Sequence, residues 1–139
     1  RYMVSTEEIG ARAYEMLSAS DVAKSITGVV DWARTDYTKE DIIIVPHAIT
    51  GEGQPRFGQI NVNIHVPDPC TKPQSGEPIY NTNFPRLVEL RKMCIDILKS
   101  HYESGEGWNW TIGMLNPPIK EPDHNEHFVS IALEITARD

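Results

Sequence analysis

Histidines are the residues whose spacing in this sequence comes closest to a pattern for metal binding. His124 and His127 are separated by two residues, a spacing that places both rings on one face of a helix. The pair instead follows Pro122 and precedes an expected strand, so we interpret the segment as a solvated loop. A metal-dependent enzyme built on His124, His127 and another histidine remains an alternative. Our prediction is that the chain has no metal or other cofactor and is not an enzyme.

His65 is a second candidate, because it falls on the polar side of an expected strand together with Asn61 and Asn63. A histidine in that position can act as a general base or as a ligand. The polar row has no carboxylate or nucleophile at matching spacing. We therefore expect this row to be a solvated or subunit-facing surface of a sheet.

Trp108 and Trp110 are candidates for a stacking platform that binds a base, a sugar or a peptide. They share a period of two with Ile112 and Met114, and an apolar row of that kind is typical of a buried sheet face. We expect these residues to be part of the core. The alternative is a small ligand- or peptide-binding module that uses this face and the loop over residues 67–83.

Other catalytic signals are absent from the sequence. There is no GxSxG, P-loop, GxGxxG or HExxH motif, and Gly51 and Gly53 are too isolated to form a phosphate cradle. The two cysteines do not make a disulfide framework and have no metal-ligand spacing. We expect both thiols to be reduced, with Cys94 in the core and Cys70 in a proline-rich loop.

The composition is that of an ordinary globular protein. The chain has 139 residues, of which 40% are hydrophobic and 24% charged, and we expect a single domain over residues 1–139. The formal net charge of −7 gives no counterion release on a phosphate backbone, which argues against specific nucleic-acid binding. No apolar run approaches the roughly 20 residues needed to span a bilayer, so we expect no membrane insertion.

Periodicity predicts an α+β fold. Ser5 and Glu8 form a capping-box pattern for a helix that ends near Leu17, and a second helix starts at Phe84 and is expected to carry a stripe that includes His101. The order of elements favours a mainly antiparallel or mixed sheet with the two main helices packed on one face. About five strands are expected: Val29 to Ala33, Asp41 to Pro46, Phe57 to Val66, Trp108 to Leu115 and Phe128 to Thr136.

The segment over residues 67–83 is long for a loop in a compact domain and contains four prolines. Loops of this length are usually binding segments or disordered. We therefore expect a subunit interface on this loop and on the polar row of the preceding strand. The candidate interface residues are Asn61, Asn63, His65, Asp68, Pro69, Pro73, Pro78 and Tyr80.

The stretch from Asp41 to Leu90 carries a resemblance to a known family. The run Asp41 to Val45, then Asn61-Val62-Asn63-Ile64-His65-Val66-Pro67-Asp68, a loop and a helix that begins with Arg86-Leu87, resembles small structural proteins of tailed phages and prophages. The order of elements is similar to that of the tail-terminator, or tail-completion, proteins of the neck region.

The resemblance implies a structural role without a catalytic motif. Proteins of that family form rings, often hexameric, that cap the tail tube and join it to the head. The resemblance therefore implies a homo-oligomer that contacts other tail or neck proteins, in the host cytoplasm during assembly and then in the virion.

Overall fold

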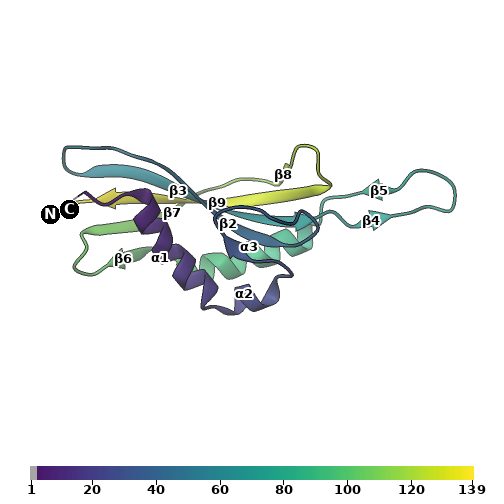
Figure 1. Ribbon diagram of the computed structural model, residues 1–139, viewed down its shortest axis with the longest axis horizontal. Helices are drawn as coiled ribbons and strands as arrows, with labels where there is room; N and C mark the ends of the chain where they lie inside the picture. Colours follow the sequence, from purple (N-terminus) through teal and green to yellow (C-terminus); the bar gives the residue numbers. More distant parts are fainter. Residues whose placement is uncertain (1–2) are drawn as a thin grey trace.

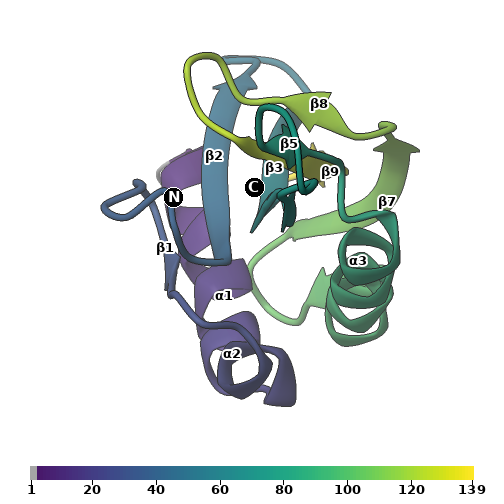
Figure 2. The same ribbon diagram turned by 90° about the vertical axis from the view of Figure 1, so that its right-hand side faces the viewer.

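The computed structural model describes residues 3–139 as an α+β fold with three helices and nine strands (Figures 1 and 2). This confirms the predicted fold class. The elements in chain order are α1 (Thr6–Ser18), α2 (Asp21–Ser25), β1 (Val30–Asp31), β2 (Asp41–Ile49), β3 (Arg56–Pro67), β4 (Cys70–Thr71), β5 (Ile79–Tyr80), α3 (Phe84–Leu98), β6 (His101–Glu103), β7 (Trp108–Leu115), β8 (Ile119–Lys120) and β9 (Glu126–Ala137).

Seven of the strands form one curled, mixed sheet in the order β1-β2-β3-β9-β7-β6, with β8 also paired to β9. Only β1 and β2 are parallel to each other, and the other pairs in this sheet are antiparallel. The two longest strands, β3 and β9, pair along their whole length, from Arg56 opposite Ala137 to Pro67 opposite Glu126. They form the centre of the sheet, so residues near the end of β3 lie close to the start of β9.

The helices cover one side of the sheet (Figure 1). Alternate residues of β3 and β9 point to that side and are fully buried, because a strand with a period of two has one apolar face. The helices α1 and α3 present their buried stripes to these strands. The resulting core includes Ile9, Ala13, Leu17, Ile60, Val62, Ile64, Leu87, Leu90, Cys94, Leu98, Trp110, Ile131, Leu133 and Ile135.

Local signals in the sequence explain where both main helices begin. Ser5 caps α1, with its side chain accepting from the backbone N–H of Glu8 while the Glu8 side chain bonds back to Ser5. At the start of α3, Asn83 accepts from the backbone N–H of Arg86 at 3.3 Å. Arg86 also pairs with Glu40 at 2.7 Å, which fastens α3 to the segment before β2.

The end of α3 differs from the prediction. The helix ends at Leu98, and Lys99 has a positive φ of 46°, so the helical stripe does not extend to His101. His101 instead lies on β6 and pairs across the strands with Trp110. The sheet also has more strands than the expected five, because β6 and β8 are too short to show a period of two.

The segment over residues 67–83 is an ordered projection rather than an irregular loop. Cys70 pairs with Tyr80 and Thr71 with Ile79, and the backbone N–H of Asn81 donates to the carbonyl oxygen of Pro69 at 3.3 Å. Figure 1 shows these two strands extending well beyond the sheet, at the end opposite the chain termini. We call residues 69–81 the arm, and every residue in it is exposed.

Within residues 3–139, none of the helices has the length and apolar character needed to cross a membrane.

Candidate functional site

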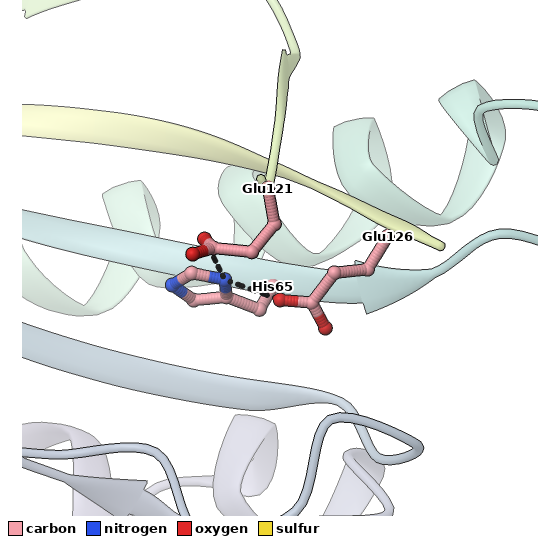
Figure 3. A group of neighbouring side chains, drawn as sticks. All are labelled: His65, Glu121 and Glu126. Carbon is pink, nitrogen blue, oxygen red and sulfur yellow. Dashed lines mark hydrogen bonds and ion pairs between the residues drawn. The ribbon is translucent and has the colours of Figure 1, made fainter. Parts of the chain in front are cut away.

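A cluster of charged side chains lies where β3 ends and β9 begins, next to the base of the arm. His65 lies near the end of β3, is only 6% exposed, and places Nδ1 3.1 Å from Oε1 of Glu126. Its ring stacks on Phe128, with 4.9 Å between ring centroids. Figure 3 shows Nδ1 of His65 facing both Glu126 and Glu121.

Arg34, in the connection between β1 and β2, brings the positive charge into this cluster. Its Nη2 donates to Oε2 of Glu126 at 2.7 Å, and its Nη1 donates to Oε1 of the same carboxylate. Its Nε donates to Oδ2 of Asp41 at 2.7 Å. The planar guanidinium is suited to this arrangement because its five N–H groups form a fixed fork.

The electrostatics of Glu126 result from two opposing effects. Burial disfavours the charged carboxylate and raises its pKa, whereas the hydrogen bonds from His65 and Arg34 and their positive charges lower it. The pairing outweighs burial, so the pKa of Glu126 lies below its usual value. Glu126 is therefore an ionised carboxylate at neutral pH although its side chain is fully buried.

Glu121 completes the cluster from the turn between β8 and β9. Its Oε2 lies 3.8 Å from Nδ1 of His65, and its side chain is 24% exposed. Its backbone N–H donates to the carbonyl oxygen of Glu126 at 3.0 Å, which holds the two ends of the turn together. Within the described residues, His65, Glu121 and Glu126 are the group of three potential metal ligands, with the ligand atoms all within 4.8 Å of one another.

The base of the arm is fixed to the body by His127 on β9. Its Nδ1 lies 2.8 Å from Oδ1 of Asp68, which precedes the arm, and its Nε2 lies 3.2 Å from the hydroxyl oxygen of Thr82, which follows it. The backbone N–H of Asp68 also donates to the carbonyl oxygen of Asn125 at 2.9 Å. One histidine thus contacts both ends of the arm, which sets the direction in which it leaves the body.

A pocket of about 310 Å³ lies beside this anchor. Its walls include Tyr37 and Tyr80, and His124 stacks on Tyr37 with 3.6 Å between ring centroids. The aromatic ring of Tyr37 also lies 4.7 Å below the Arg34 guanidinium. The pocket therefore lies between the arm and Tyr37, whose ring contacts Arg34 of the charged cluster.

The residues of the expected interface separate into three groups. His65 and Asp68 are buried, at 6% and 8% exposure, and each is paired within the chain. The burial of His65 differs from the expected exposed polar row, because Glu126, Glu121 and Phe128 all lie against its ring. Asn61 and Asn63 are half-buried, and the remaining four are exposed on the arm: Pro69, Pro73, Pro78 and Tyr80.

The remaining candidate residues, two tryptophans, Met114 and two histidines, do not form a common site. Trp108 and Trp110 are 5% and 0% exposed, which confirms that they belong to the core, and the Trp110 Nε1–H donates to the carbonyl oxygen of Lys99 at 2.9 Å. Met114 is 68% exposed, contrary to prediction, because the pairing of β7 with β9 shifts register between Ile112 and Leu115. His124 and His127 have separate partners, and no group of three ligands among residues 3–139 contains either of them.

Arg34, Asp41 and Glu126 were not identified from the sequence. Arg34 and Glu126 are 92 positions apart, so no local spacing connects them. The sequence contains one indication of a buried ion pair. Asp41 comes directly before a run of β-branched residues, and a carboxylate beside a buried strand needs a partner.

Neither a protein-family model nor a curated protein matches this chain.

Proposed function

We propose that the protein is a non-enzymatic assembly subunit of a tailed phage or prophage, a tail-terminator-like ring protein at the head–tail junction. The observation that carries the proposal is the arm, which extends from a body that is already well packed. The sequence of β2, β3 and α3 resembles small structural proteins of tailed phages and prophages, and the order of elements is similar to that of tail-terminator proteins; both support the same role.

The arm has the properties of a segment that binds a neighbour. A two-stranded ribbon by itself is marginally stable in water, and the arm has no third strand among the residues described. It also exposes apolar side chains, with Ile79 49% and Tyr80 45% exposed. A partner that covers the arm stabilises it by burying this surface and by pairing with free backbone groups at its edges.

The position of the arm favours a head-to-tail contact between copies. It leaves one end of the molecule, where it can reach the body of a neighbouring copy (Figure 1). A head-to-tail contact of this kind is heterologous. It generates a ring when the rotation between successive copies brings the last copy back to the first. The first partner is then a second copy of the chain, followed by other tail or neck proteins, in the host cytoplasm during assembly and afterwards in the virion.

The proposal is tested by measuring the mass of the protein by light scattering over a wide range of concentration, with electron microscopy of the largest species. We expect a ring of defined mass. Replacing residues 70–80 with a two-residue turn should give a monomer, because Pro69 and Asn81 already approach each other closely enough to be joined.

A matched pair of substitutions separates an effect of the arm from a general effect of charge. Ile79→Asp puts a carboxylate on the arm, whereas Tyr102→Asp makes the same kind of change on β6, where Tyr102 is 69% exposed. Ile79→Asp should weaken assembly and Tyr102→Asp should not. A wild-type protein that stays monomeric, or a ring that survives removal of the arm, would contradict the proposal.

A further inference from the structure

We propose that His65, Glu121 and Glu126 form a binding site for a divalent transition-metal ion of the Zn²⁺ class. The site is separate from the arm, goes beyond the assembly role, and replaces our prediction from the sequence that the chain binds no metal. The ion would join the turn between β8 and β9 to the end of β3.

The distances between the ligand atoms are close to those of a metal site. Nδ1 of His65 lies 3.1 Å from Oε1 of Glu126 and 3.8 Å from Oε2 of Glu121. Zn²⁺ binds nitrogen and oxygen at about 2.1 Å, so two ligands of a tetrahedral ion lie about 3.4 Å apart. All three ligand atoms lie within 4.8 Å of one another, so binding requires the Glu121 side chain, which is 24% exposed, to move toward the ion.

The backbone holds the two glutamate residues close together before an ion binds. Glu121 and Glu126 lie at the two ends of one turn, and their backbone hydrogen bond of 3.0 Å fixes the distance between the ends. Their side chains come together over β3, where His65 projects between them (Figure 3). A site whose ligands are already placed loses little conformational entropy on binding.

The cluster has a net negative charge, which favours the binding of a cation. Asp41, Glu121 and Glu126 supply three carboxylates, and Arg34 supplies one guanidinium in contact with two of them, so the net charge is −2 when His65 is neutral. A divalent ion brings this charge to zero. Lys120 is not counted in this sum, because its ammonium group donates to the backbone carbonyl oxygens of Glu121 and His124 and not to the carboxylates.

Arg34 is compatible with the ion because it uses other lone pairs of Glu126. A carboxylate has about four lone-pair positions. The guanidinium occupies one on each oxygen of Glu126, which leaves the position on Oε1 that faces His65. Metal-binding carboxylates are commonly held by outer hydrogen bonds of this kind, which fix their orientation.

The mixture of one imidazole and two carboxylates selects the type of ion. Imidazole favours Zn²⁺ and related transition metals, whereas Mg²⁺ and Ca²⁺ prefer sites made of oxygen alone. Nδ1 must offer its lone pair to the ion, so the one remaining ring proton lies on Nε2 and a proton held on Nδ1 is released to solvent on binding. The alternative occupant of the same position is that proton, in an ordinary His–Glu ion pair.

The test is calorimetric titration of the EDTA-treated full chain with ZnCl₂ and, in parallel, with MgCl₂. We expect one Zn²⁺ per chain, a rise in the melting temperature of the Zn²⁺-loaded protein, and no comparable effect of Mg²⁺. Glu121→Gln should weaken Zn²⁺ binding by about tenfold or more. Because Glu121 is partly exposed, this variant is expected to fold, which its circular dichroism spectrum will check.

The matched control is Glu103→Gln. Glu103 also pairs with a histidine, at 2.7 Å from Nε2 of His101, but belongs to no group of three ligands within residues 3–139. It should bind Zn²⁺ like the wild type. Equal weakening by both variants, unchanged binding in Glu121→Gln, or no Zn²⁺ binding by the wild type would overturn the proposal and leave the proton as the occupant.

Discussion

Arg34 donates hydrogen bonds to both carboxylate oxygens of Glu126, a residue 92 positions further along the chain. The Arg34 side chain is 8% exposed and that of Glu126 is fully buried. The contact joins the connection between β1 and β2 to the first residue of β9. Because both charges are withdrawn from water, each offsets the desolvation cost of the other.

Removing Arg34 should therefore destabilise the protein strongly. In Arg34→Met the carboxylates of Glu126 and Asp41 lose their shared guanidinium, and breaking a buried pair of this kind costs about 3–5 kcal/mol of unfolding free energy. Urea denaturation followed by circular dichroism measures the loss.

The comparison variant for this prediction is Arg12→Met. Arg12 also contacts two carboxylates, those of Glu15 and Glu103, but its side chain is 40% exposed. Exposed pairs contribute about 1 kcal/mol or less. Equal losses in the two variants would show that burial of the Arg34 pair has no energetic consequence.

The long elements of the fold could be predicted because their signals are local. The alternation from Gln59 to Val66 and the capping box of Ser5 and Glu8 each lie within a few residues, and β3 and α1 follow from them. The short strands β6 and β8 contain three and two residues, too few for a period to appear. Each pairs with a longer strand that was predicted separately, β6 with β7 and β8 with β9.

The charged cluster could not be predicted because it is formed by pairing at long range. His65 belongs to a row of alternating polar residues that is typical of an exposed sheet face. His65 is buried by Glu121, from a turn whose conformation has no period, and by Glu126 and Phe128, from a strand that begins 61 positions further along the chain. The arm was predicted only as a long segment with an interface, since the prolines of residues 67–83 gave no sign of the β4–β5 pairing.

Gly28 should not tolerate a side chain. A Cβ at this position would lie 2.3 Å from the carbonyl oxygen of Glu40 and 2.0 Å from Oδ1 of Asp41. Neither atom can withdraw easily, because Gly28 N–H donates to the Glu40 oxygen at 2.8 Å and Asp41 pairs with Arg34. We expect Gly28→Ala to lose about 1–3 kcal/mol of stability in thermal or urea unfolding.

The control for this backbone contact is Gly51→Ala. Gly51 lies in the turn between β2 and β3, and a Cβ added there would meet no heavy atom within 4 Å. Its substitution should change the unfolding free energy by no more than about 0.5 kcal/mol. A Gly28 variant as stable as the Gly51 variant would mean that the chain near Glu40 rearranges freely.

The two cysteines should differ in reactivity. Burial raises the pKa of the Cys94 thiol to about 12, so almost no thiolate forms at pH 8. Cys70 lies exposed on the arm. A chromogenic disulfide reagent should therefore modify one thiol rapidly in the native protein and two after denaturation.

Thiol reactivity also reports on the assembly proposed above. If the arm binds a neighbouring copy, Cys70 should react more slowly in the ring than in the monomer, while Cys94 remains unreactive in both. Cys70→Ser, which removes the fast reaction, identifies the thiol that is modified. Rapid reaction of Cys94 in the folded wild-type protein would contradict the burial of the α3 stripe.

Glu103 should make stability depend on pH in the acidic range. Its hydrogen bond with His101 lowers the pKa of the carboxyl below its usual value, and Arg12 acts in the same direction against the effect of burial. A carboxyl with a lowered native pKa stabilises the fold above its unfolded pKa, about 4.3, and this contribution is lost as the pH falls through the native pKa.

Glu103→Gln should therefore lower the melting temperature at pH 7, and the difference from the wild type should shrink as the pH falls below about 4. The expected loss at pH 7 is about 1 kcal/mol or less, since the Glu103 side chain is partly exposed and solvent screens the pair. Glu52→Gln, which changes an exposed carboxylate in the turn after β2, serves as the control for the altered net charge. A difference between Glu103→Gln and wild type that grows toward low pH would contradict this assignment, because it would require that folding raises the pKa of Glu103.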